Sequence, residues 1–389
     1  MDTKAFKGLN DVSDPLRLGL GWFVQADNVD ITDTGSVITR HGYALTTAGS
    51  YTAMFSTFDY QRCYVVNAGV LQTFEGLFIA NLTSTATMYW TEVNDQVYFN
   101  NGTDSGVITP ANTLLPWAWP TPNVPTVAAV TGNLPAGAYS VRCTYLMADG
   151  RETGTSDPGE ITLDGTMALQ ISGISQWQGR TNVYIAPANS SVYQLAGTVS
   201  GSTFNYYDAS NNSLGRDLVY AFMDPLPLGT TVTQFWKGAM YTAFYMAQQD
   251  ATAVFFTEPL AFHLFNLDSN FFMVPGKVLM LAPTDDALIV ATGTRMWTYD
   301  ADAKLGQIAE YGVVPGQHWC LDSDEDGKRT ILFWSTRGVC SGLPFTNLTE
   351  RQVSVAPGLS AGGTVVLHGG QKRYVVALQQ GGSAFDSYP

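Results

Sequence analysis

One local pattern recurs along most of this chain: a short strand of alternating apolar and polar residues, a tight turn, and a second alternating strand. It occurs six times, in residues 60–74, 88–102, 234–245, 285–299, 327–342 and 369–381. Helical periodicity is almost absent, and the turns carry Gly, Asn or Asp, as at Asn94-Asp95, Lys237-Gly238 and Arg337-Gly338. A side-chain period of two, joined by such turns, predicts an all-β protein built from antiparallel hairpins.

The later hairpins follow one another at a regular interval. They are centred near residues 236, 286, 331 and 374, close to the roughly 40–50 residues of one four-stranded propeller blade. A single hairpin cannot bury its apolar face alone, so repetition predicts units that pack against one another. We therefore expect a β-propeller of about five to seven blades.

The regular interval breaks between residues 102 and 234. PWAWPTPNVPTV (116–127) carries four prolines, which predicts a stiff extended linker, and DPLPLG (224–229) closes the interval. Between them lie several alternating segments and a turn at Asp149-Gly150. These features predict an inserted β-sandwich of the fibronectin or immunoglobulin kind. The missing Cys–Trp–Cys signature of true immunoglobulins favours the fibronectin-like form.

The chain thus divides into four expected parts, which are an N-terminal arm with a closure strand (1–44), a first propeller part (45–122), the inserted sandwich (123–218) and a second propeller part (219–389).

The net charge of the chain limits the kinds of partner that it can bind. The chain has 19 Lys and Arg against 33 Asp and Glu, a formal net charge of −14. Such a balance argues against a protein that grips nucleic acid through its phosphates, because that requires a positive face. The negative charge is compatible with an acidic channel wall that nucleic acid passes without binding, because such a wall repels phosphates. Neither a signal peptide after MDTKAFKGLND nor a long apolar run is visible, so we expect no membrane insertion.

Catalytic motifs are missing from the sequence. The four histidines (His41, His263, His318 and His368) form no HExxH, and no GxSxG, GxxxxGK[ST] or strand-following GxGxxG occurs. Carboxylates from distant blades could still pair for glycoside hydrolysis, but most acidic residues lie in turns. We expect no catalysis and no cofactor.

Two groups of residues carry side chains that can bind metal ions. Cys63, Cys143, Cys320 and Cys340 lack CxxC spacing, so they are interpreted as reduced core thiols. Asp322, Asp324 and Asp326 occupy positions one, three and five of a calcium loop, followed by Gly327 at position six. Position twelve is Phe333, which is no ligand, so an acidic β-turn is the preferred interpretation and the metal site is a weak candidate.

Apolar residues near the N-terminus and in the Pro-rich linker predict assembly contacts. Leu16, Leu18, Leu20 and Trp22 alternate, as expected for an arm that lies on a neighbouring subunit. Trp117 and Trp119 are expected to pack the insertion against the propeller or against a neighbour.

A strand pair, Asn28–Asp33 and Ser36–Arg40, is expected to follow the arm. Its second strand is predicted to complete the last blade beside Arg373–Leu378, because a ring of blades must close.

Three phrases carry a family resemblance. FKGLNDVSDPLRLGLGWFVQADNVDITDTGSVITRHGY (6–43) resembles the N-terminal segment of tailed-bacteriophage virion proteins, with an aromatic-Gly-Leu-Asn phrase, then Ala-x-Asn-Val-Asp-Ile and Arg-x-Gly. VFFTEPLAFHLFN (254–266) is similar to the family's aromatic-aromatic-Ser-Glu-Pro segment, with Thr257 where Ser is commoner. TILFWSTRGVCSG (330–342) is similar to its Phe-x-Ser-x-x-Gly hairpin. The first phrase rests on Phe6, Gly8, Leu9, Asn10, Ala26, Asn28, Val29, Asp30, Ile31, Gly35, Arg40 and Gly42.

The family that these phrases resemble is the β-propeller tail nozzle or tail hub of short-tailed phages, described as a packaged-DNA stabilisation protein. The resemblance implies a homo-hexameric ring that continues and helps seal the DNA channel, next to adaptor or portal-side proteins and tail fibres or a needle. It also implies DNA that passes without specific binding, a place in the virion tail, and assembly in the host bacterial cytoplasm. The fibronectin-like insertion has no counterpart in that pattern.

Two other functions stay open. One is a tail fibre-attachment, host-binding or capsid-decorating module, and the less favoured one is a β-propeller glycosidase or lyase.

Overall fold

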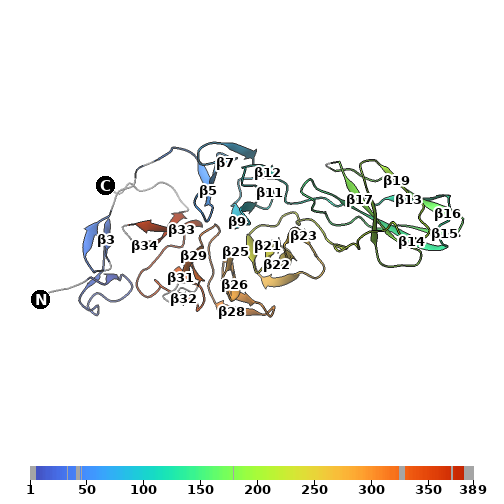
Figure 1. Cartoon of the computed structure of the whole chain (residues 1–389). Coiled ribbons are helices and arrows are strands. Elements are labelled where there is room, and N and C mark those ends of the chain that lie inside the picture. Colours follow the sequence, from blue (N-terminus) through green and yellow to red (C-terminus); the bar gives the residue numbers. More distant parts are fainter. Residues whose placement is uncertain are drawn as a thin grey trace.

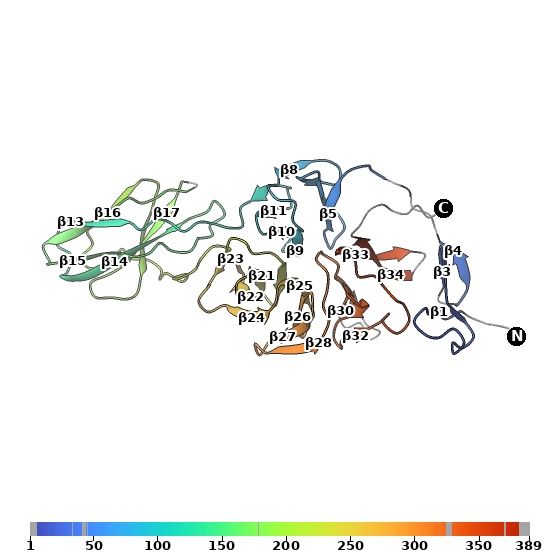
Figure 2. The ribbon, with the colours of Figure 1, turned by 180° about the vertical axis from the view of Figure 1, so that it is seen from behind.

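The structure is a computed structural model of the chain, and it describes residues 6–32, 34–40, 44, 46–177, 179–323, 329–368 and 371–380. All regular secondary structure in these residues is β-strand, in agreement with the predicted all-β class. The molecule is elongated, with the strands nearest the N-terminus at one end and the inserted strands at the other (Figure 1). The view from behind shows the same order of sheets between these ends (Figure 2).

Six sheets of antiparallel strands follow one another along the chain outside the insertion, and we number them I to VI. Sheet I is β5 (Tyr51–Ser56), β6 (Cys63–Asn67), β7 (Val70–Thr73) and β8 (Phe78–Asn81). Sheet II is β9 (Tyr89–Val93), β10 (Gln96–Asn100), β11 (Ser105–Ile108) and β12 (Leu114–Leu115). Sheet III is β20 (Thr233–Trp236), β21 (Ala239–Met246), β22 (Ala251–Glu258), β23 (Ala261–Phe265) and β24 (Phe271–Pro275).

The remaining sheets complete the series. Sheet IV is β25 (Val278–Pro283), β26 (Ala287–Thr292), β27 (Met296–Asp300) and β28 (Leu305–Ala309). Sheet V is β29 (Cys320–Ser323), β30 (Arg329–Ser335), β31 (Gly338–Ser341) and β32 (Thr346–Asn347). Sheet VI has two strands, β33 (Ser360–His368) and β34 (Gln371–Gln379).

Turn residues explain why these strands fold back as hairpins. Asn94-Asp95 (φ 51° and 60°) and Lys237-Gly238 (φ 46° and 85°) both have two positive φ values, the backbone of a type I′ turn. These two predicted turns are confirmed. The predicted turn at Arg337-Gly338 is displaced by one residue, because Gly338 already pairs with Ser335. Gly338 instead opens β31 at φ 104°, which favours glycine there.

The core lies between consecutive sheets. In β10, Val97 and Phe99 belong to the buried cluster shared with sheet I, whereas Tyr98 belongs to the cluster shared with sheet III. In β26, Leu288 faces sheet III and Ile289 faces sheet V. Because neighbouring residues of a strand point to opposite faces, strands such as β10 and β26 contribute to two clusters. A similar cluster joins sheets V and VI.

The first strands of the sheets gather on one side of the series. Each of β5, β9, β20, β25 and β29 forms one edge of its sheet, and β20 lies next to both β9 and β25. Gln317, just before β29, bonds across to β9: its side chain accepts from the Trp90 N–H at 3.0 Å and donates to the Trp90 carbonyl at 3.2 Å. Sheets II and V are therefore linked although two sheets separate them in sequence. This arrangement is consistent with a propeller-like fold.

The insertion forms two packed sheets, as predicted for a β-sandwich. One sheet has the order β13-β16-β19 and the other β15-β14-β17-β18, around a common apolar core. The strands are β13 (Thr126–Thr131), β14 (Gly137–Tyr145), β15 (Gly159–Leu163), β16 (Met167–Ser172), β17 (Thr181–Ala186), β18 (Gln194–Val199) and β19 (Thr203–Tyr206).

The N-terminal segment forms two small sheets. β1 (Gly8–Leu9) pairs in parallel with β2 (Trp22–Phe23), and β3 (Val29–Ile31) forms an antiparallel hairpin with β4 (Val37–Thr39). The hairpin was predicted. Among the described residues, however, β4 pairs with β3, and β33 and β34 pair with each other, so the predicted pairing of the hairpin beside Arg373–Leu378 does not form there. An ion pair between Arg373 and Asp30, 2.8 Å long, holds the hairpin near β34 instead.

Candidate functional site

The N-terminal arm, which the sequence predicted to be an assembly surface, presents two leucine side chains to solvent. Leu16 is 95% exposed and Leu20 is 66% exposed, whereas Leu18 is partly covered. Trp22 is also partly buried, because β2 places it over Gly8, where a Cβ would meet its ring at 3.4 Å. Trp22 therefore fastens the arm to β1, and the two leucines form its free apolar surface.

The two linker tryptophans are not available to a neighbouring subunit. Trp117 is 1% exposed, donates from Nε1 to the Phe262 carbonyl at 2.6 Å, and lies between sheets II and III. Trp119 is also buried, and it meets Trp177 of the insertion edge-on at 4.6 Å between ring centroids. Of the two predicted alternatives, these contacts agree with packing of the linker and the insertion within the chain rather than against a neighbouring subunit.

The weak metal candidate lies partly outside the described residues, where Asp324 and Asp326 fall. Asp322 lies in β29 and forms an ion pair with Lys372 of β34. Among the described residues, no three His, Cys, Asp or Glu side chains gather closely enough to hold a metal ion. The four cysteines are all free thiols, with Cys143 and Cys340 buried.

The two ends of the sheet series have partly uncovered apolar faces. On sheet I, Met54 and Phe78 are both 58% exposed on the face that points away from sheet II, although Val65 between them in register is buried. On sheet VI, Val366 and Val375 are about two-fifths exposed on the face away from sheet V. Each sheet between them contributes to a buried cluster on both of its faces, so the ends differ from the rest of the series.

A cavity of about 500 Å³ opens where the first strands of five sheets converge. Its wall includes Glu92 of β9, Gln234 and Trp236 of β20, and Leu321 of β29. Phe58, which follows β5, and Asp285, which follows β25, also line the cavity. We call this the axial pocket. Its volume lies within the roughly 300–1,000 Å³ typical of small-molecule sites.

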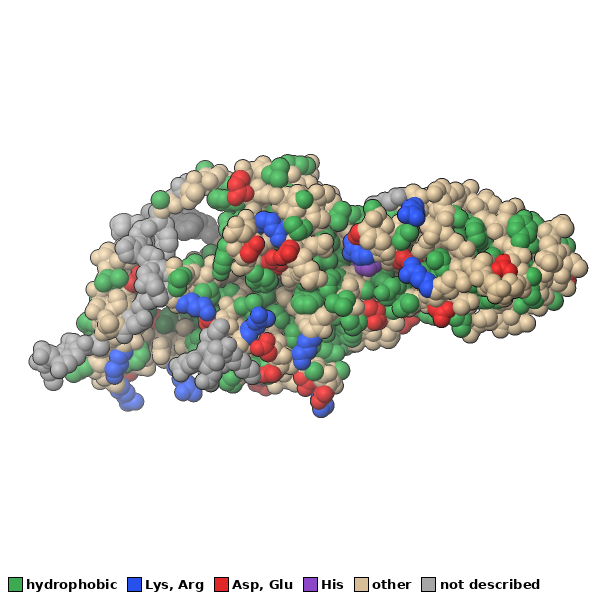
Figure 3. Space-filling model, in the orientation of Figure 1, with side chains coloured by type: hydrophobic (Ala, Val, Ile, Leu, Met, Phe, Trp, Pro, Cys, Tyr) green, Lys and Arg blue, Asp and Glu red, His purple; other side chains and the backbone are tan. Residues whose placement is uncertain are grey.

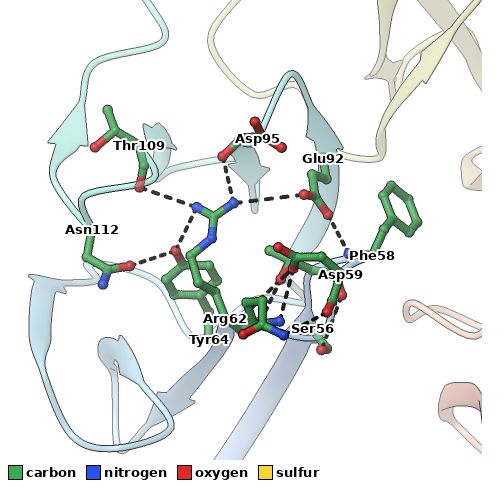
Figure 4. Close-up of polar contacts among 11 residues, drawn as sticks. Ser56, Phe58, Asp59, Arg62, Tyr64, Glu92, Asp95, Thr109 and Asn112 are labelled. Carbon is green, nitrogen blue, oxygen red and sulfur yellow. Dashed lines mark hydrogen bonds and ion pairs between the residues drawn. The ribbon is translucent and has the colours of Figure 1, made fainter.

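A polar network beside the pocket holds two of its wall residues in place (Figure 4). The Phe58 N–H donates to Glu92 Oε2 at 2.7 Å, and Arg62 Nη2 lies 3.8 Å from Glu92 Oε1. The same Arg62 nitrogen donates to the Asp95 carbonyl at 2.7 Å, and Nη1 donates to Tyr64 Oη at 3.3 Å. Arg62 therefore ties the loop after β5 to the β9–β10 turn, which leaves Phe58 over the pocket.

Three groups of the pocket wall already have partners within the chain. Trp236 Nε1 donates to the Thr284 carbonyl at 2.9 Å, and Thr284 Oγ1 donates to the Ala287 carbonyl at 2.7 Å. Lys237 Nζ lies over the Trp236 ring, 5.0 Å from its centroid. These groups are already occupied by structural contacts, and none of them forms the nucleophile–base pair that covalent catalysis requires.

One buried polar atom of the pocket wall is different. Gln234 is only 4% exposed, and its Oε1 has no hydrogen-bond partner among the described residues, although its Nε2 donates to the Phe235 carbonyl at 3.0 Å. Sequence reasoning missed both Gln234 and Glu92. The available signal was their shared position, because each lies two or three residues before the turn of consecutive hairpin units, at Asn94-Asp95 and Lys237-Gly238.

Charged side chains are mixed over the visible face of the molecule. Figure 3 shows acidic and basic groups in small neighbouring sets, with apolar surface between them. No helix in the described part of the chain could span a membrane.

Comparison with known proteins finds only distant structural likeness. No protein-family model matches this chain, and no curated protein matches it. Similar solved structures include the extracellular domain of BT4673 from B. thetaiotaomicron, at 9% identity and a TM-score of 0.28, over 82% of this chain and 36% of that one. Another is PorZ of the type-IX secretion system of Porphyromonas gingivalis, at 12% identity and a TM-score of 0.22, over 88% and 52%. The fission yeast SREBP–SCAP binding domains match at 8% identity and a TM-score of 0.26, over 89% and 94%. The chain thus spans about a third of the length of the BT4673 domain and about half of the length of PorZ.

Proposed function

We propose that this chain is a structural, non-catalytic protein of a bacteriophage tail, a nozzle or hub ring that continues and helps seal the DNA channel. In this proposal six copies form the ring next to adaptor and portal-side proteins, with tail fibres or a needle attached. In this proposal sheets I to VI act as propeller blades, a number within the predicted range of about five to seven, although no buried cluster of the described residues joins sheet VI to sheet I.

The N-terminal segment is the observation that carries the proposal. It contains the phrase that resembles tailed-phage virion proteins, and its Leu16 and Leu20 are exposed on an arm fastened by Trp22. Exposed single leucines are ordinary, but two on one arm give a neighbouring subunit an apolar surface to cover. The uncovered faces of sheets I and VI agree with a protein whose surfaces are completed by assembly.

The charge supports the same function. A hexamer carries six times the formal charge of −14, so its channel repels phosphates more than it binds them. DNA then passes without a specific contact.

A second candidate function is host binding or surface decoration by the insertion. The observation that favours it is position, since β13–β19 lie at the end of the molecule opposite β1–β4 (Figure 1). Tyr207, just after β19, is also half-exposed. A β-sandwich that projects from the ring is positioned to contact the surface of a host cell.

Deletion of the gene from the phage that encodes it tests the proposal. Particles without this protein are expected to package DNA and then lose it, so that the packaged DNA becomes sensitive to DNase. Particles that retain protected DNA but fail to adsorb to cells would favour the host-binding function instead.

A further inference from the structure

We infer that the axial pocket is a binding site for a neutral saccharide, one or two sugar units in size. The site is formed by the ends of the first strands and is separate from the arm and the uncovered sheet faces. The inference therefore goes beyond the proposed structural function and does not depend on it.

Aromatic side chains give the pocket the first property of a sugar site. Trp319 and Phe58 contribute aromatic surface to its wall, and Phe58 is 58% exposed, whereas Trp236 is 5% exposed and lies beneath Lys237. The C–H face of a pyranose is apolar, and an aromatic ring buries that face with little loss of conformational freedom, because both are rigid. Phe58 is held over the pocket by the Glu92–Arg62 network, so a bound ring meets a preformed surface.

Unpaired acceptors give the second property. Gln234 Oε1 is buried without a partner, and a buried acceptor left unpaired costs about 1–3 kcal/mol relative to a paired one. That oxygen has almost no accessible surface of its own, so a ligand hydroxyl supplies the missing donor only when the Gln234 amide turns toward the cavity. Glu92 uses one oxygen for the Phe58 N–H and has its other oxygen 3.8 Å from Arg62, so it retains capacity to accept from a second hydroxyl.

Charge balance selects a neutral ligand. Glu92 and Asp285 on the wall are matched by Lys237 and Arg329. A wall with two charges of each sign gives no net attraction for a polyanion or a polycation, whereas hydroxyl groups can pair with both kinds. A phosphate or sulfate ligand would have to lie near the two carboxylates, and a free ammonium group near the two cations.

The test uses the purified full-length chain and a panel of neutral saccharides. The probes are the methyl glycosides of glucose, galactose and N-acetylglucosamine together with maltose and chitobiose, read by tryptophan fluorescence and saturation-transfer NMR. We expect at least one probe to bind and to change the fluorescence. Gln234→Leu is expected to weaken that binding at least tenfold while leaving the unfolding midpoint in urea unchanged or higher, because it removes an unpaired buried acceptor.

A second pair of variants separates stacking from folding. Phe58→Ala should weaken binding by a similar factor, and Tyr60→Ala, which removes an 81% exposed ring two residues away, should not. Gln249→Leu in an exposed turn is the matched control for Gln234→Leu.

Three results would overturn the inference. These are no binding by any probe, binding that is unchanged in both Gln234→Leu and Phe58→Ala, and a preference for glucuronic acid or glucosamine over the neutral sugars.

Discussion

Replacement of Trp117 tests whether the Pro-rich linker is part of the folded core. The indole is 1% exposed, lies edge-on to Tyr98 with 5.4 Å between ring centroids, and packs at 6.4 Å from Phe265. Removing a buried tryptophan to alanine costs about 3–5 kcal/mol of unfolding free energy. Trp117→Phe keeps most of the packing but leaves the Phe262 carbonyl without its Nε1 donor, which costs about 1–3 kcal/mol.

The assay is urea unfolding of the purified chain, followed by circular dichroism, together with native mass spectrometry for subunit number. Both variants should lower the unfolding midpoint, Trp117→Ala more than Trp117→Phe, with no direct effect on subunit contacts. If Trp117→Ala left the unfolding free energy within about 0.5 kcal/mol of the parent, as is usual for surface sites, and changed subunit number instead, the assignment of Trp117 to the core would be refuted.

Three further predictions concern the arm, the network beside the pocket, and a buried histidine. The double variant Leu16→Ser/Leu20→Ser should leave monomer stability unchanged, because both side chains are exposed. It should weaken assembly by about 2–5 kcal/mol if both side chains are buried in the subunit interface. Sedimentation of assembled tails measures this effect, and unimpaired assembly would contradict the prediction. Arg62→Met should lower the free energy of unfolding in urea by about 3 kcal/mol, because it leaves the nearly buried Glu92 carboxylate without its cation. The double variant Arg62→Met/Glu92→Gln should recover part of that loss, because it removes the unpaired charge. Burial lowers the pKa of His318 from 6.5 to about 4. The unfolded chain therefore binds more protons between these values, and the stability that is complete above pH 6.5 falls by about 3 kcal/mol as the pH drops to 4; a His318→Gln variant whose stability retains the same slope would show that another group is responsible.

Strand positions could be predicted from the sequence because they depend on local patterns. A side-chain period of two and turn pairs such as Asn94-Asp95 act over a few residues, so the hairpins in sheets II and III are found where they were expected. The one-residue error at Gly338 has a local cause as well. A glycine at positive φ can end a turn or begin a strand, and the sequence does not distinguish the two.

Contacts between distant segments were harder to predict. The sequence left open whether Trp117 packs within the chain or against a neighbour, because its partner Phe262 lies 145 residues further along the chain. The predicted pairing of β4 with β34 was wrong. That pairing depends on how far the series of sheets curves, which the local sequence pattern does not determine. Gln234 and Glu92 meet in the axial pocket for the same reason, through the convergence of separate first strands.

The most direct test of the proposed function is an averaged electron-microscopy image of the purified phage tail, with the protein located by a tag on the insertion. The proposal predicts six copies in one ring below the portal and adaptor, with the Leu16–Leu20 arm against the neighbouring copy and an electronegative channel wall. A ring lined by basic side chains, or copies found only on tail fibres or on the capsid surface, would contradict it.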